Sequence, residues 1–173
     1  TYSIGFRAPA RQELAQELLV RLAEDAGEEE AALLYRDTKQ EAVDTPAAIH
    51  AQLQAFAREA LARALSQPRG LERALGEYLT EPKPSVWFEP GDVCVMLEGV
   101  RLDRRSRMMY DTHHVFINGE SYRAAGRDAT LMRRLADERK LTARELARAS
   151  DDALELLSSW CDAGWAHVWA GGE

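Results

Sequence analysis

The chain has 173 residues and a formal net charge of −7, and 46% of its residues are hydrophobic. This composition suits one domain or two small ones with a real core, and it excludes a disordered chain. The charge is −4 over residues 1–80 (nine basic, thirteen acidic) and −3 over 81–173 (thirteen basic, sixteen acidic), so neither half has the basic body of a general nucleic-acid binder.

The cysteines and the apolar runs limit the location of the protein. Cys94 and Cys161 have neither metal-ligand spacing nor a disulfide framework, so we interpret them as buried free thiols in a reducing compartment. No apolar run reaches membrane-spanning length, and no signal peptide is visible. We therefore expect a cytoplasmic protein with no membrane partner.

The first nine residues alternate between apolar and polar side chains, which is the period of a half-buried strand. Tyr2, Ile4 and Phe6 share one face, and Pro9 ends the run. The next strand-like run lies in the second half of the chain, so this strand has no sequence neighbour with which to pair. A lone strand exposes its backbone donors and acceptors. We therefore expect residues 1–8 to be the last strand of a sheet whose other strands are missing here.

Apolar periodicity then predicts three helices joined by polar loops. The expected helices span 9–26, 45–65 and 68–79, with one further helical turn at 31–35. Thr45 is the expected N-cap of the second helix, because the following proline suits a first helical turn. The two prolines of residues 81–84 stop the third helix and stiffen the chain, so a domain boundary is expected there.

These helices have wide apolar stripes that are rich in alanine. A helical segment of this length makes a thin core by itself, so we expect it to gain stability against a further surface. One candidate is a second copy of the chain, since alanine lets helices approach closely. The alternative is ordinary packing against the second half of the same chain.

Beyond residue 84 the pattern changes to short strands and short helices. Strands are expected at 93–97, 100–102, 108–110, 114–117, 120–122 and 165–169, and helices at 128–135, 142–146 and 151–163. Asn118-Gly119 predicts a tight hairpin turn, and Thr142 with Glu145 a capping box. Asp128, and either Asp151 or Asp152, are the expected caps of the other two helices. A small sheet, a helix–turn–helix pair and a closing strand predict a winged-helix-like α+β domain over 85–173.

Many winged-helix domains bind DNA, so the charges of the expected recognition helix indicate whether this one does. The second helix of the helix–turn–helix pair, 151–163, contains four acidic residues and no Lys or Arg. Base edges are read by Arg, Lys, Asn or Gln, and phosphates need basic partners. We therefore expect no specific DNA binding through this helix and favour a structural or protein-contacting role.

One basic cluster remains, formed by Arg101, Arg104, Arg105 and Arg107, with Arg123 and Arg127 near it. One interpretation is a solvated hairpin edge, where charges discourage edge-to-edge aggregation. The other is a patch that contacts ribosomal RNA or an acidic partner. The acidic neighbours Asp103 and Asp111 dilute the charge and favour the first interpretation.

The run Asp111-Thr112-His113-His114 holds metal-ligating residue types just before a hairpin. A non-haem iron site needs two histidines and a carboxylate on one face, and this run has no third ligand. We expect a loop with exposed imidazoles, and no metal site in the chain.

The octapeptide Tyr-Ser-Ile-Gly-Phe-Arg-Ala-Pro, residues 2–9, resembles the last core strand of bacterial JmjC-type ribosomal oxygenases. The resemblance implies a chain that is mostly α and then α+β. Its parts are the last strand of a cupin barrel at 1–8, a helical dimerisation domain at 9–81 and a winged helix at 85–173. It also implies a homodimer, and a parent enzyme that uses Fe(II) and 2-oxoglutarate to hydroxylate an arginine of a large-subunit ribosomal protein.

The same resemblance gives the first strand its site residues. Thr1 and Ser3 would face the cosubstrate pocket, and Arg7 would lie on the substrate side at the exit of the strand. The iron ligands of the family are not found in these residues, so we expect the 173 residues alone to bind no cofactor and to be inactive. The alternative from another class is a free-standing winged-helix dimer that acts as a transcriptional regulator or protein-binding adaptor.

Overall fold

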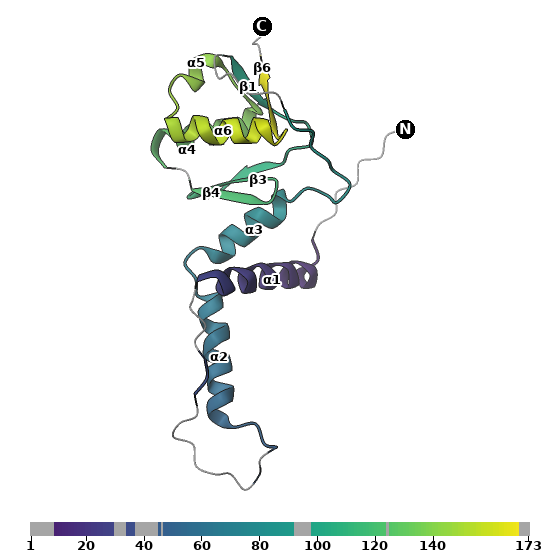
Figure 1. Ribbon diagram of the computed structural model, residues 1–173, viewed down its shortest axis with the longest axis vertical. Helices are drawn as coiled ribbons and strands as arrows, with labels where there is room; N and C mark the ends of the chain where they lie inside the picture. Colours follow the sequence, from purple (N-terminus) through teal and green to yellow (C-terminus); the bar gives the residue numbers. More distant parts are fainter. Residues whose placement is uncertain are drawn as a thin grey trace. The chain divides into compact units, whose positions relative to one another are not determined.

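The computed structural model describes residues 9–29, 34–36, 45, 47–91, 98–123 and 125–169 (Figure 1). The strands expected at 1–8 and 93–97, together with Cys94, lie outside these residues. Of the helical turn expected at 31–35, Leu34 and Tyr35 are described, and neither is helical. The chain divides into two compact units, Thr1–Ala74 and Leu75–Glu173.

The first unit is built from α1 (Arg11–Glu29), α2 (Ala51–Leu65) and the beginning of α3 (Gly70–Thr80). Among its described residues, the only buried hydrophobic side chains are those of Leu22 and Ala74. An ion pair between Arg73 and Asp25 joins α3 to α1, and the rings of Tyr35 and Phe56 pack with their centroids 5.5 Å apart. The core of this unit is therefore small.

The second helix begins later than the sequence pattern indicated, at Ala51 rather than at residue 45. His50 is extended, with φ −67° and ψ 142°, and its Nδ1 atom accepts a hydrogen bond from the Gln52 amide at 3.3 Å. The expectation that Thr45 caps the helix is therefore wrong. The Thr45 carbonyl instead accepts from the Ala48 amide in a separate turn, and the extended backbone at His50 prevents the helix from reaching further back.

Two three-stranded antiparallel sheets form the second unit. In one, β1 (Gly99–Leu102) lies between β5 (Lys140–Leu141) and β6 (Ala166–Trp169). In the other, β3 (His114–Ile117) lies between β2 (Met108–Tyr110) and β4 (Glu120–Arg123). The predicted turn is confirmed: Asn118 and Gly119 have φ angles of 49° and 91°, as a type I′ hairpin requires.

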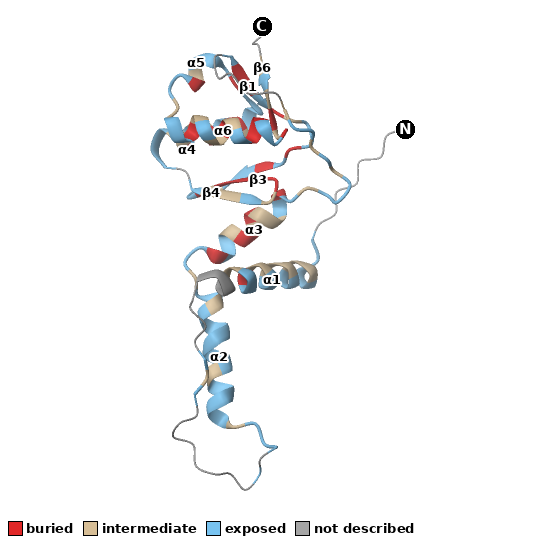
Figure 2. Cartoon of the chain, viewed as in Figure 1, coloured by how far each residue is buried: buried red, intermediate tan, exposed pale blue. Residues whose placement is uncertain are grey.

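Three helices complete this unit: α4 (Gly126–Glu138), α5 (Ala143–Leu146) and α6 (Asp151–Asp162). α4 contacts both sheets, and α6 contacts β6. The core lies between these helices and strands and includes Trp160, Ile117, Leu135 and Leu157, all fully buried. Figure 2 shows this burial as red segments on α4, α6 and β3, whereas α2 is pale blue along most of its length.

The predicted capping box is confirmed, because the Glu145 carboxylate accepts hydrogen bonds from the amide and hydroxyl of Thr142. The other two expected caps are wrong. α4 begins after Ala125, and the Asp128 carboxylate accepts instead from the Ser150 amide and hydroxyl, at 3.1 and 2.8 Å. Ser150 itself caps α6 by accepting from the Ala153 amide at 3.2 Å. Asp128 therefore joins α4 to the start of α6.

The end of α3 is tied to the hairpin turn by one buried hydroxyl. Thr80 Oγ1 donates to the Gly76 carbonyl at 2.8 Å and accepts from the Gly119 amide at 3.1 Å. Gly76 lies so close to Phe116 that a Cβ atom there would be 2.4 Å from the ring. The missing side chain at residue 76 therefore permits this close packing.

Candidate functional site

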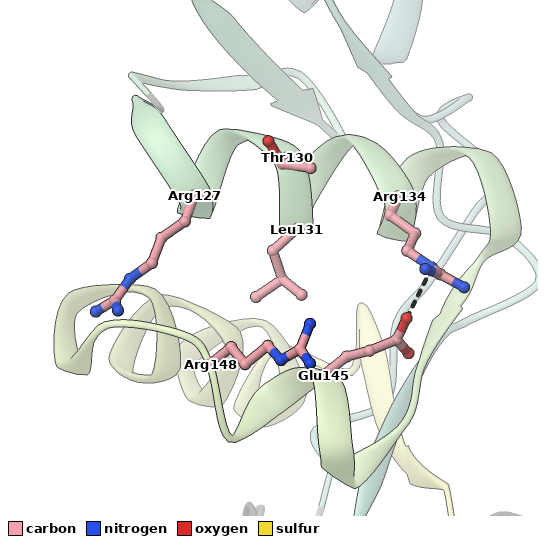
Figure 3. A pocket seen from close by; sticks show the side chains of 6 residues that line it. All are labelled: Arg127, Thr130, Leu131, Arg134, Glu145 and Arg148. Carbon is pink, nitrogen blue, oxygen red and sulfur yellow. Dashed lines mark ion pairs between the residues drawn. The ribbon is translucent and has the colours of Figure 1, made fainter.

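A shallow pocket of about 270 Å³ lies between α4 and α5 in the second unit. Its lining residues are Arg127, Thr130, Leu131, Arg134, Glu145 and Arg148. Figure 3 shows Arg127 and Arg134 projecting from α4, with Leu131 between them and with Arg148 and Glu145 on the opposite side of the pocket. The lining thus combines three arginine side chains with one carboxylate and the apolar side chain of Leu131.

The single carboxylate of the pocket already has partners. Glu145 Oε1 lies 2.7 Å from Arg134 Nε, and Glu145 Oε2 accepts the two hydrogen bonds from Thr142. The pKa of Glu145 is lowered, first by the amide and hydroxyl of Thr142 and then by the charges of Arg134 and Arg148, against the opposing effect of burial. Glu145 is therefore ionised at neutral pH and neutralises only one of the three guanidinium groups.

Arg127 and Arg148 are held less directly than Arg134, although the charge of Arg148 acts on Glu145. Neither guanidinium makes a hydrogen bond or an ion pair with another residue in the described part of the chain, and both side chains are exposed. Arg134 also lies 3.1 Å from the Glu138 carboxylate. The pocket thus keeps two cations for a ligand, and its chemistry is that of an anion-binding site.

The cluster expected at residues 101–107 does not form one patch. Arg105 pairs with Asp103 at 2.9 Å and lies over the Phe88 ring, and Arg107 donates to the Glu81 carbonyl at 3.1 Å. The hydrogen bonds from Arg105 hold the pKa of Asp103 well below its usual range. Burial opposes this lowering, and the hydrogen bond with His167 adds to it. Arg104 is exposed beside them.

Arg101 lies apart from that bend, on the face of the β5–β1–β6 sheet. Its cross-strand neighbours are Lys140 on β5 and His167 on β6. The Lys140 ammonium lies 4.8 Å from the centroid of the Trp169 ring, and His167 is 3.0 Å from Asp103. Both side chains beside Arg101 therefore have neighbours of their own, and these three cross-strand residues are less available to a ligand than the pocket.

The histidine loop also differs from the expectation. His114 is the first residue of β3 and only 6% exposed, so the prediction of exposed imidazoles is wrong for this residue. The Asp111 carboxylate accepts from the His113 and His114 amides at 2.6 Å and lies 3.3 Å from His114 Nδ1. Asp111 thus shapes the turn into β3. Within the described residues, no group of three or more His, Cys, Asp or Glu side chains is placed to hold a metal ion.

The second helix of the helix–turn–helix pair, α6, carries the acidic surface expected from the sequence. Asp151, Asp152, Glu155 and Asp162 are exposed on α6, which has no basic residue. Such a surface repels phosphate groups.

The pocket residues were not grouped by sequence reasoning, which placed only Arg127 near another cluster. A signal existed: Arg127, Leu131 and Arg134 are spaced four and three residues apart, on one face of α4. Arg148 lies on a different segment, and only the folded structure brings it to the same pocket. Thr1, Ser3 and Arg7 lie outside the described residues, so their expected roles stay predictions.

Solved structures of one protein, YcfD, resemble this chain over nearly its whole length. The X-ray structure of Escherichia coli YcfD matches with a TM-score of 0.70 and 21% identity, over 94% of this chain and 46% of that one. A structure described as the E. coli ribosomal oxygenase YcfD matches equally well, over 96% and 48%. At these identities the likeness shows the fold, and the chain spans about half the length of these relatives. No curated protein matches the sequence.

No helix in the described part of the chain is long and apolar enough to cross a membrane. The ROXA-like winged helix family matches residues 56–167, which include α4, α5, α6, the pocket and both sheets except the last two residues of β6. That match covers well over half of the sequence. The chain therefore belongs to the ROXA-like winged helix family.

Proposed function

We propose that this chain is the part of a ribosomal oxygenase that follows the catalytic cupin barrel, and that it joins two copies of the enzyme and helps to shape the approach to its substrate. The observation that supports this most strongly is the match of nearly the whole chain to about half of YcfD, with a TM-score of 0.70. The parent enzyme would hydroxylate an arginine of a large-subunit ribosomal protein.

The proposed chemistry belongs to the parent enzyme and not to the described residues. Two structures of YcfD contain cobalt, one with succinic acid and one with 2-oxoglutarate, which supports Fe(II) and 2-oxoglutarate as cofactors of the parent. The described residues do not fit an iron site, because they lack a group of three metal ligands. Their proposed role is assembly, and no catalytic step is assigned to them.

The assembly role is supported by the surface of α2. No residue of Ala51–Leu65 is buried. Even the large apolar side chains of Leu53, Leu61 and Leu65 are 41%, 66% and 57% exposed. α2 carries only Arg58, Glu59 and Arg63 as charged residues, and Arg63 pairs with Glu59 at 2.8 Å. An exposed apolar helix with this little charge can pack against the same helix of a second copy without repulsion.

The oxygenase proposal is tested on the complete protein that carries this chain, supplied with Fe(II), 2-oxoglutarate and large-subunit ribosomal proteins. We expect mass spectrometry to find one added oxygen atom on an arginine-containing peptide, and none when 2-oxoglutarate is omitted. Failure to consume 2-oxoglutarate under these conditions would contradict the proposal.

The dimer proposal has its own test, which needs no enzyme activity. Leu53→Glu places a charge within the exposed apolar stripe, and Ala62→Glu places the same charge on the opposite side of α2, nine residues further along. Analytical ultracentrifugation should show dissociation of the first variant and a dimer for the second. Equal behaviour of the two variants would exclude α2 as the interface.

A further inference from the structure

The pocket between α4 and α5 holds more positive charge than the protein itself neutralises. Three arginines, Arg127, Arg134 and Arg148, line the pocket with one carboxylate, Glu145, whose two oxygen atoms already bind Arg134 and Thr142. Glu138, outside the lining, also pairs with Arg134 and leaves one positive charge in excess. Guanidinium groups that line the same pocket repel one another, and a bound anion lowers that repulsion. Figure 3 shows the guanidinium groups of Arg127 and Arg148 spread around Leu131 with space between them.

We propose that this pocket binds an acidic segment of a partner protein, with an Asp or Glu carboxylate between Arg127 and Arg148 and an apolar side chain on Leu131. The arrangement of the lining supports both parts of the ligand. Guanidinium groups bind a carboxylate through two parallel hydrogen bonds, and Leu131 offers the apolar contact that an isolated inorganic anion would leave unused.

The size of the pocket favours a peptide side chain over a cofactor. Its volume of about 270 Å³ is below the roughly 300–1,000 Å³ that is usual for small-molecule and cofactor sites. Its lining comes from one face of α4 and from residues 145–148. One or two side chains of an extended segment fit such a site, while the rest of the segment continues over the surface.

The neighbouring charges favour a peptide over a nucleic acid. Asp128 follows Arg127 directly and binds Ser150, and Asp151 and Asp152 begin α6 immediately after Ser150. A nucleic-acid strand carries a phosphate at every nucleotide and is repelled by these carboxylates. A peptide can place an uncharged residue there, so alternating acidic and apolar residues suit the whole surface.

The binding test uses the complete chain and a fluorescein-labelled peptide of alternating glutamate and leucine. We expect fluorescence anisotropy to rise on addition of the protein, and Arg127→Gln and Arg148→Gln each to weaken binding by roughly tenfold. Arg144→Gln is the matched control, because Arg144 is exposed on α5 but does not line the pocket. It removes the same charge and should leave affinity nearly unchanged.

Further probes distinguish this proposal from simple charge attraction and from nucleic-acid binding. A peptide of alternating glutamine and leucine should bind at least roughly tenfold more weakly, and a single-stranded RNA with equal negative charge should also bind more weakly. Tighter binding of the RNA, equal binding of the neutral peptide, no binding of the acidic peptide, or an equal loss in Arg144→Gln would each overturn it. Thermal unfolding of each variant confirms that it is folded. The result is independent of the oxygenase proposal, which concerns a different activity and a different part of the enzyme.

Discussion

Trp160 on α6 and Leu61 on α2 are both large apolar side chains on amphipathic helices, yet they have opposite environments. Trp160 is 1% exposed, in a core that is shared by both sheets and α4. Leu61 is 66% exposed on a helix that has no buried residue. The second unit therefore carries its own core, whereas α2 of the first unit leaves its apolar side chains exposed. A helical stripe in the sequence does not by itself distinguish the two cases.

The largest expected effect is that of Trp160→Ala. Truncation of a fully buried Trp removes its burial and leaves a cavity, so the free energy of unfolding of the second unit should fall by about 3–5 kcal/mol. All four tryptophans, at positions 87, 160, 165 and 169, belong to the second unit. Urea unfolding followed by the fluorescence of the remaining tryptophans therefore measures this unit, and an unchanged midpoint would contradict the core described above.

A smaller effect is expected from Asp103→Asn, because Asp103 accepts three hydrogen bonds from Arg105 and lies 3.0 Å from His167 Nε2. Loss of its charge should cost about 1.5–3 kcal/mol at neutral pH. Since the folded state lowers the pKa of Asp103, its contribution is complete above the unfolded value of about 3.9 and is lost as the pH falls below it. The wild type should therefore lose its advantage over the variant in acid; an equal difference at every pH would contradict this account.

Ser150→Ala should lower stability by about 1 kcal/mol, because it removes the cap of α6. It also leaves the Asp128 carboxylate without the Ser150 hydroxyl. Ser159→Ala is a suitable control, since the exposed Ser159 hydroxyl only donates to the Leu156 carbonyl of its own helix. Thermal unfolding followed by tryptophan fluorescence should separate the two variants, and equal midpoints would show that Ser150 is not a significant cap.

The smallest effect on folding is expected from Leu61→Ala. Its side chain is mostly exposed in the single chain, so the free energy of unfolding of a dilute monomer should change by less than about 0.5 kcal/mol. The same variant should weaken self-association. Circular dichroism of dilute protein measures the first quantity and ultracentrifugation the second, and a large loss of stability in the monomer would mean that Leu61 packs within its own chain.

Sequence reasoning succeeded where one local signal decides the structure. The Asn118-Gly119 turn and the Thr142–Glu145 capping box are set by residues close together in the chain, and both are confirmed. It failed where a distant partner competes for the same side chain. Asp128 looked like a cap, but Ser150, far along the sequence, binds its carboxylate. His114 looked exposed beside a charged run, but the packing of β3 buries it.

The candidate site was harder to predict than the fold for the same reason. Spacing along α4 brings Arg127, Leu131 and Arg134 to one face, but only the short connection through α5 brings Arg148 and Glu145 opposite them. At the start of α2, Thr45 followed by a proline matched the usual N-cap pattern, whereas histidine is not a favoured N-cap residue, so the local pattern pointed to the wrong residue. The extended backbone at His50 decided the start of α2.

The most direct measurement is the mass of the purified chain in solution, by size-exclusion chromatography with light scattering over a range of concentrations. The account predicts a particle of twice the 19.4 kDa chain mass, which dissociates in Leu53→Glu but not in Ala62→Glu. A particle of 19.4 kDa at every concentration would contradict it, because the exposed apolar surface of α2 would then have no second copy to cover it.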